Sequence, residues 1–174
     1  MLIRNIRSLE NPVTHRAEIW SIPADESVRA DAVGKKILAD SKLDLFQSKY
    51  SPDGRWIVFE GIRDLQSVLY VVPANGGTWV PITDGKHWCD KPRWSADGRL
   101  IYFLAESAGF INLWGIRFDH RTGETRGAAS RITSFKNPRL MIPIYIPSID
   151  FSLNRNALVL PIQEKSGSIW ILDN

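Results

Sequence analysis

The stretch Tyr50–Glu60, YSPDGRWIVFE, recurs 44 residues later as Trp94–Leu104, WSADGRLIYFL. In both copies a Ser-x-Asp-Gly element is followed by an apolar run. Asp can hydrogen-bond to its own backbone two residues on, and Gly adopts positive φ at no steric cost. A tight turn beside apolar runs predicts a β-hairpin. The residues that we expect to form these turns are Ser51, Asp53, Gly54, Ser95, Asp97 and Gly98.

The repeat continues beyond each hairpin. Val68–Val72 and Asn112–Ile116 keep the spacing of 44 residues, whereas Ile82-Thr83 and Ile132-Thr133 are 50 residues apart. An insertion around Asp119–Gly127 accounts for the difference. We expect this insertion to form a loop, because insertions specific to one repeat belong in loops.

Weaker copies flank the two clear ones. Ile149–Leu160 keeps the strand–turn–strand pattern, with Asn154 and Arg155 in place of Asp-Gly, and Ser166–Leu172 resembles the strand that follows. On the other side, Ala17–Pro23 is expected to form a third strand and Gly34–Leu38 a fourth. The segment Asp25–Ala39 lacks a firm apolar stripe, so we expect a loop and a strand there rather than a helix.

The second strand of each clear copy is apolar without interruption. Trp56–Phe59 and Leu100–Leu104 do not alternate with polar residues, so both faces of these strands are expected to be covered. Blades of a β-propeller cover one another in this way, and their repeats run to about 40–50 residues. The predicted fold class is all-β: a single partial β-propeller of about three to four four-stranded antiparallel blades. The approximate blades are residues 1–44, 45–88, 89–140 and 141–174.

At these residues the chain resembles the Asp-Gly repeats of TolB-like, WD40-like β-propellers. Their pattern, Pro-x-Trp-Ser-Pro-Asp-Gly-x-x-Ile-x-Phe, is similar to Pro92–Gly98 and to Tyr50–Phe59, and the resemblance extends over Ala17–Asn174. The chain also looks like the C-terminal propeller part of bacterial multidomain sensor proteins. The resemblance implies a non-catalytic segment for protein or ligand binding. The alternative is the propeller of a prolyl-oligopeptidase-like hydrolase whose catalytic domain lies elsewhere.

Composition fits a folded domain of 174 residues. Hydrophobic residues make up 44% and charged residues 24% of the chain, and the net charge of +3 is scattered rather than clustered. Scattered charge predicts no nucleic-acid partner. The single cysteine, Cys89, excludes an internal disulfide. With no signal-peptide-like or membrane-spanning apolar run, we expect no membrane partner and a cytoplasmic location by default.

No catalytic, metal or cofactor site is predicted. There is no Gly-x-Ser-x-Gly elbow, and the spacing of His87, Cys89 and Asp90 matches no standard zinc signature. In a propeller, the loops between strands two and three share one face with the loops between blades, so we expect a ligand there. The candidate ligand-binding residues are Arg63, Asp64, His87, Trp88, Asp90 and Phe110.

The expected partners follow from the incomplete ring. A protein partner or a covalently linked domain is expected, and a small ligand is a second candidate. Open end blades would expose apolar residues such as Ile19, Ile37, Leu158 and Leu160. Large exposed apolar patches are rare on monomers, so the end blades are expected to favour self-association.

Overall fold

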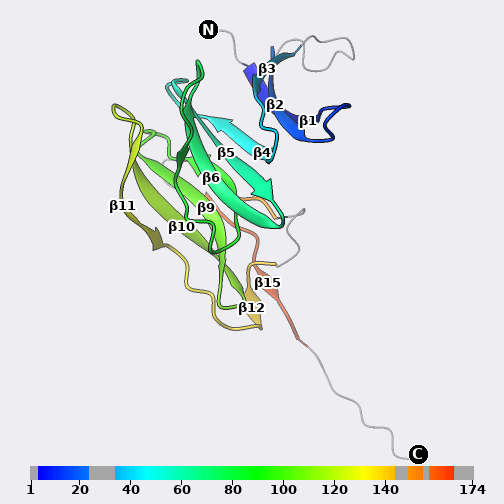
Figure 1. Ribbon diagram of the computed structural model, residues 1–174. Helices are drawn as coiled ribbons and strands as arrows, with labels where there is room; N and C mark the ends of the chain where they lie inside the picture. The colour runs from blue at the N-terminus through cyan, green and yellow to red at the C-terminus, as the bar shows by residue number, and fades with distance from the viewer. Residues whose placement is uncertain (1–3, 24–33, 144–148, 155–156, 167–174) are drawn as a thin grey trace, which may run out of the picture.

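The computed structural model describes residues 4–23, 34–143, 149–154 and 157–166 (Figure 1). All regular elements in these ranges are β-strands, so the prediction of an all-β fold is confirmed. None of these ranges contains a helix that is long and apolar enough to span a membrane. The strands are β1 (Arg4–Glu10), β2 (Ala17–Pro23), β3 (Lys35–Leu38), β4 (Asp44–Tyr50), β5 (Trp56–Arg63), β6 (Gln66–Pro73), β7 (Val80–Pro81), β8 (Cys89–Trp94), β9 (Leu100–Ser107), β10 (Phe110–Asp119), β11 (Glu124–Arg131), β12 (Leu140–Met141), β13 (Ser152–Leu153), β14 (Leu158–Val159) and β15 (Gln163–Glu164).

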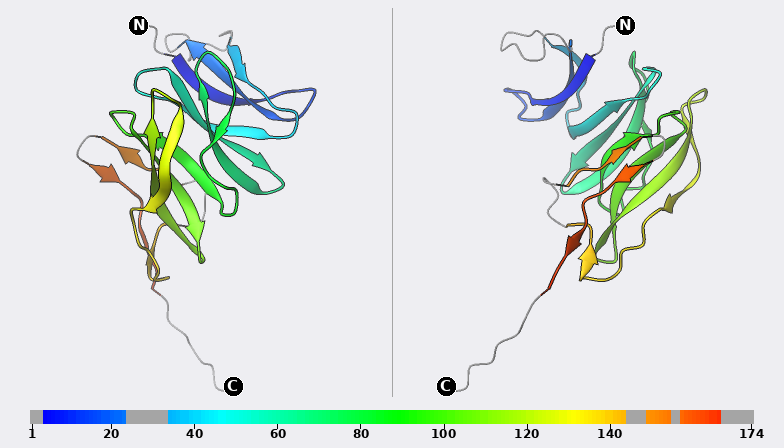
Figure 2. Two further views of the ribbon diagram at one scale, coloured as in Figure 1. Left: turned by 60° about the vertical axis from the view of Figure 1, so that its left-hand side comes forward. Right: turned by 180° about the vertical axis from the view of Figure 1, so that it is seen from behind.

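Three antiparallel sheets follow one another along the chain and in space (Figures 1 and 2). The first has the order β1-β2-β3, the second β4-β5-β6-β7 and the third β8-β9-β10-β11. Strands β1 and β2 contact β4, and strands β4, β5 and β6 contact β8, so each sheet packs on the next through its face. This is the arrangement of consecutive propeller blades.

The turns of the second and third sheets are alike atom by atom. Ser51 Oγ donates to Asp53 Oδ1 at 2.6 Å and accepts the N–H of Trp56 at 3.0 Å. Ser95 Oγ makes the matching bonds to Asp97 Oδ1 at 2.6 Å and to the N–H of Leu100 at 2.9 Å. Each serine therefore ties the turn to the first residue of the strand that follows it.

The pKa of Asp53 shows how strongly this turn holds its carboxylate. Partial burial by itself would raise that pKa, but the hydrogen bonds from Ser51 and Arg55 outweigh burial and hold it at about 2. The pKa of Asp97 is also lowered, first by the hydrogen bond from Ser95 and then by the N–H of Arg99. Both turns are therefore built around an ionised carboxylate at neutral pH.

The buried cores lie between sheets, which explains the unbroken apolar run of the second strand. Along β5, Ile57 and Phe59 face the first sheet, and Val58 faces the third. Along β9, Phe103 faces the second sheet and Leu104 faces the residues after β11. The prediction that these strands are covered on both faces is confirmed.

One end of the array is less open than expected. Ile19 has no exposed surface, because it packs with Leu38 and Leu45 between the first and second sheets, and half-buried Ile37 joins the same cluster. The expectation that Ile19 would lie on an open face was therefore wrong. Leu158, by contrast, is exposed, and Leu160 is half-buried.

The insertion forms part of a hairpin rather than a loop, which corrects the prediction. Residues Asp119–Gly127 extend the β10–β11 hairpin, with Asp119 opposite Glu124. The Ile-Thr pairs nevertheless keep equivalent roles on either side of the insertion. Thr83 Oγ1 accepts the N–H of Leu69 at 3.0 Å, and Thr133 Oγ1 accepts the N–H of Leu113 at 2.9 Å.

Both ends of the chain depart from the predicted strands. Strand β1 was not expected, because Arg4–Glu10 carries charges rather than an apolar run; its backbone pairs with β2 over seven residue pairs. At the other end, β13 and β14 are strands of two residues each that pair as a short hairpin, and β15 pairs with β12 instead of with β14. The strand expected after Ser166 lies outside the described residues, as does Arg155.

The first strand of each four-stranded sheet contains a bulge that was not predicted from the sequence. Gln47 in β4 has φ 53° and Lys91 in β8 has φ 55°, and the pairing with the next strand shifts at both places. The two residues are 44 apart, which is the spacing of the repeat. The bulge is therefore part of the repeated unit.

Candidate functional site

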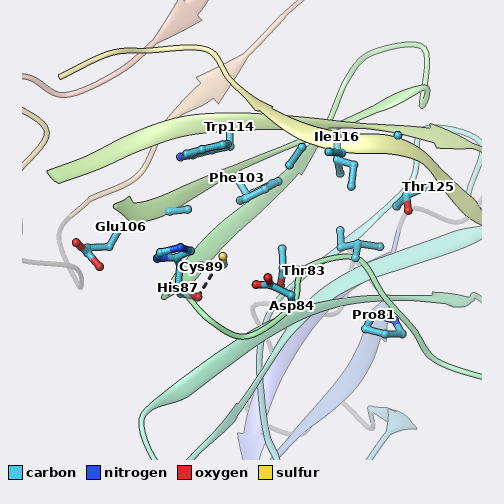
Figure 3. A pocket seen from close by; sticks show the side chains of 15 residues that line it. Pro81, Thr83, Asp84, His87, Cys89, Phe103, Glu106, Trp114, Ile116 and Thr125 are labelled. Carbon is cyan, nitrogen blue, oxygen red and sulfur yellow. Dashed lines mark hydrogen bonds between the residues drawn. The ribbon is translucent and has the colours of Figure 1, made fainter. Parts of the chain in front are cut away.

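A pocket of about 460 Å³ lies between the second and third sheets (Figure 3). Its apolar wall comes from the face of the third sheet and includes Phe103, Trp114 and Ile116. The opposite wall is formed by Pro81 and the loop that leads from β7 to β8. In Figure 3, Glu106 and His87 lie at one end of this pocket, and Pro81 and Thr125 lie at the other.

Two local irregularities open this space. Strand β7 has only two residues, so the second sheet leaves the outer part of its neighbour uncovered. Strand β11 carries extra residues where its pairing with β10 shifts between Gly115 and Arg117, and Gly127 takes φ 74° there. The bulged residues Gly127, Ala128 and Ala129 line the pocket with small side chains.

The titratable side chains of the pocket include two carboxylates and the imidazole of His87. The carboxylates are Asp84 and Glu106, and the described part of the lining contains no lysine or arginine. Asp84 accepts the N–H of Lys86 at 3.1 Å, and this bond lowers the pKa of Asp84. Glu106 Oε1 accepts the N–H of Gly109 at 2.6 Å, which anchors its carboxylate at the end of β9.

Two further groups contribute to the chemistry of the pocket. Burial raises the pKa of the Cys89 thiol to about 12, and its sulfur donates to the carbonyl of His87 at 3.4 Å. The indole Nε1–H of Trp114 is buried and has no hydrogen-bond partner among the described residues. The pocket therefore contains a neutral thiol, and the Trp114 donor lies beneath its surface.

Comparison with solved structures identifies the architecture. A structure from Agrobacterium tumefaciens assigned to TolB aligns with a TM-score of 0.61 and 20% identity, covering 91% of this chain and 56% of that one. TolB from Acinetobacter baumannii aligns with a TM-score of 0.53 and 19% identity, covering 91% and 37%. Puromycin hydrolase aligns with a TM-score of 0.56 and 20% identity, covering 86% and 25%.

The chain has the fold of part of a TolB-like β-propeller. No protein-family model matches the sequence. An uncharacterized protein of Agrobacterium fabrum, Atu1656, is 33% identical over 86 residues, which is 49% of this chain. The chain spans 29% of the length of that relative and between 25% and 56% of the three solved structures.

Five of the six candidate ligand-binding residues lie at one end of the sheets of this TolB-like fold. His87 lines the pocket, and the carbonyl of Trp88 beside it accepts the N–H of Glu106 at 3.0 Å. Phe110 begins β10 in the hairpin next to Glu106. Arg63 and Asp64 are exposed at the β5–β6 turn, outside the pocket lining, with Arg63 Nε 3.9 Å from Asp64 Oδ2.

Asp90, the sixth candidate, lies elsewhere, buried within the TolB-like fold. Its carboxylate is 3.5 Å from Lys91 Nζ, and both side chains are almost fully buried. Burial and the neighbouring Asp90 carboxylate raise the pKa of Glu60 to about 9. Because Asp90 pairs with Lys91 while Cys89 lines the pocket, the two adjacent side chains do not converge on one point. Among the described residues, no three His, Cys, Asp or Glu side chains are grouped to hold a metal.

Most of the pocket lining was missed by sequence reasoning. In the sequence, Phe103, Trp114 and Ile116 have the pattern of ordinary core residues, and Glu106 has that of a polar residue at the end of a strand. The available signal was the insertion around Asp119–Gly127, which lengthens the third sheet relative to the second. A longer outer strand beside a shorter one leaves part of one sheet face uncovered, and that is where the pocket lies.

Proposed function

We propose that this chain is a non-catalytic propeller segment that binds a ligand or protein, as the sensory or scaffold part of a larger bacterial protein. The pocket between the second and third sheets carries the proposal. Its volume of about 460 Å³ falls within the range of small-molecule sites, and its apolar wall with a few polar groups is typical of such sites. The four blades would be residues 1–44, 45–88, 89–140 and 141–174.

The surroundings of Cys89 favour binding over catalysis. A catalytic thiol needs a lowered pKa and a base within hydrogen-bond reach. Here burial raises the pKa of the thiol, and its partner is the backbone carbonyl of His87 rather than the imidazole. The pocket therefore supports recognition without covalent chemistry.

Chemical-shift mapping tests the proposal. A library of small molecules and short peptides is titrated into the isotopically labelled full chain, and the backbone and indole signals are followed. Specific binding should move the signals of Phe103, Trp114 and Ala128, which line the pocket from three strands of the third sheet. Binders that perturb only residues outside the pocket would overturn the proposal.

The second candidate is the propeller of a hydrolase. It is favoured by the alignment with puromycin hydrolase, which covers 86% of this chain and 25% of that protein. An α/β-hydrolase region with a Gly-x-Ser-x-Gly motif in the adjoining genomic sequence would support this candidate. A kinase-like or winged-helix region there would support the sensor instead.

A further inference from the structure

We infer that the pocket between the second and third sheets takes a ligand that combines an apolar ring or chain with a protonated amine. The inference rests on the proposed binding function and adds the chemical class of the ligand. It is drawn from the charge of the lining and from how the apolar and acidic groups are distributed.

The charge of the pocket is one-sided. Asp84 and Glu106 are carboxylates, and no lysine or arginine is among the described residues that line the pocket. Lys86 Nζ lies 3.4 Å from Asp84 Oδ2, and both side chains are largely exposed, so Asp84 is already paired and the charge available to a ligand is that of Glu106. A cation that approaches Glu106 would meet a carboxylate beside an apolar surface, where ion pairing is stronger than in open water.

The apolar and acidic groups are separated along the pocket. Glu106 lies at one end, next to His87, and the side chains of Phe103, Trp114 and Ile116 extend from there towards Thr125 (Figure 3). A ligand with its amine at Glu106 would place its apolar part along these three residues. The indole of Trp114 adds an aromatic face, which attracts cations.

The acidic lining distinguishes this pocket from the other hollows beside the third sheet. The hollow on the other face of the third sheet differs, because Arg99 and Arg117 line it. The acidic pocket is therefore the place for a cation.

Three probes of one shape test the charge preference. The full chain is titrated with 2-naphthylmethylamine, with the uncharged 2-naphthylmethanol and with 2-naphthoate, while the indole signal of Trp114 is followed by nuclear magnetic resonance. We expect the amine to bind about tenfold more tightly than the alcohol and the naphthoate more weakly than both. The Trp114 signal should move with the amine.

Variants show which carboxylates cause the preference for the amine over the alcohol. Glu106→Gln keeps an oxygen that can accept the N–H of Gly109, and together with Asp84→Asn it should make the amine and the alcohol bind equally. Glu10→Gln removes an exposed carboxylate in β1, outside the pocket lining, and should leave the tenfold preference intact. Unchanged preference in the double variant would overturn the inference.

Two outcomes separate the inference from the proposed function. Equal binding of amine and alcohol, with the Trp114 signal moving in both titrations, would overturn the charge preference and leave the binding pocket in place. If none of the three probes moves the Trp114 signal, the inference is wrong, and the library mapping then decides the binding function by itself.

Discussion

Gly123 joins two blades through a contact that no larger residue could make. It has φ 79° at the tip of the β10–β11 hairpin, and a Cβ added there would lie 2.2 Å from the ring of Trp56. The indole Nε1–H of Trp56 donates to the carbonyl of His120 at 3.0 Å, and its ring meets Phe118 edge-on at 5.4 Å. The insertion of the third sheet thus holds the first residue of β5.

Gly123→Ala should destabilise the chain far more than Gly127→Ala. Both glycines have positive φ, but nothing lies within 4 Å of an added Cβ at Gly127. At Gly127, the strain of an alanine at positive φ alone should lower the free energy of unfolding by about 1 kcal/mol. At Gly123, displacement of the Trp56 ring should lower it by about 1–3 kcal/mol more. Urea denaturation followed by tryptophan fluorescence measures both. Equal losses would show that the Trp56 ring moves aside freely.

Glu60 makes stability depend on pH in an unusual direction. Its pKa is about 9 in the folded chain against an ordinary value of 4.5, so the folded state keeps a proton that the unfolded state releases. Stability should therefore be highest below pH 4.5 for this group and fall as pH rises from there to about 9.

Glu60→Gln should remove this loss. The neutral amide matches the protonated acid in shape, so the free energy of unfolding of the variant relative to the parent chain should rise by about 4 kcal/mol between pH 5 and pH 8. Urea titrations at the two pH values test this. The same substitution at exposed Glu124 is the control. A constant difference between pH 5 and pH 8 would mean that the folded chain does not hold Glu60 protonated in this range.

At the level of elements, the Ser-x-Asp-Gly turn is the part that sequence reasoning predicts best. Its hydrogen bonds are local, because Ser51, Asp53 and Trp56 lie within six residues of one another. The apolar runs after each turn also predict burial on both faces, since no other environment tolerates them. The Asp-Gly turns and the apolar runs beside them were enough to predict the two four-stranded sheets from sequence.

Other elements could not be predicted because their causes are distant in sequence. Strand β1 forms through its pairing with β2 rather than through an apolar pattern of its own. The bulges at Gln47 and Lys91 place ordinary residues at positive φ, where glycine would have been the expected signal. The pocket depends on the difference in length between β7 and β11, which two separate parts of the chain determine.

Ser51→Ala should weaken the hairpin of β4 and β5. The serine is buried, and its hydroxyl is the acceptor for the N–H of Trp56, so the substitution leaves that donor unpaired. We expect a loss of about 1–3 kcal/mol in the free energy of unfolding. Pro52→Ala, at an exposed position of the same turn, is the matched control and should be near neutral. An equal effect of both substitutions would argue against the role of the hydroxyl.

At the level of the whole molecule, the two ends of the array differ. The region of β1 and β2 exposes Leu9 and Val13, whereas the region of the last strands exposes four large apolar side chains among the described residues. Exposed apolar side chains favour association, and the open edges of the two-stranded sheets add a tendency to pair with other chains. The exposed apolar residues in this region are Leu140, Leu158, Val159 and Ile162.

We therefore expect the chain to self-associate through this end. Val159→Lys combined with Ile162→Lys should shift the population towards monomer, because charges oppose burial of the patch. Val13→Lys, at an exposed apolar residue between β1 and β2, should leave association unchanged. Size-exclusion chromatography with light scattering distinguishes these cases. A parent chain that stays a monomer at all concentrations would contradict the expectation.

The placement of the cores between sheets has a consequence for how such a chain can evolve. A core between blades is completed whenever one 44-residue unit follows another, so tandem duplication of the coding segment creates a new core along with each new blade. The matched bulges at Gln47 and Lys91 are what copying of one ancestral unit would leave behind. If the chain lengthens by whole blades, the inner strands stay alike and the outer strands are free to vary in length. The pocket lies where two outer strands, β7 and β11, differ in length.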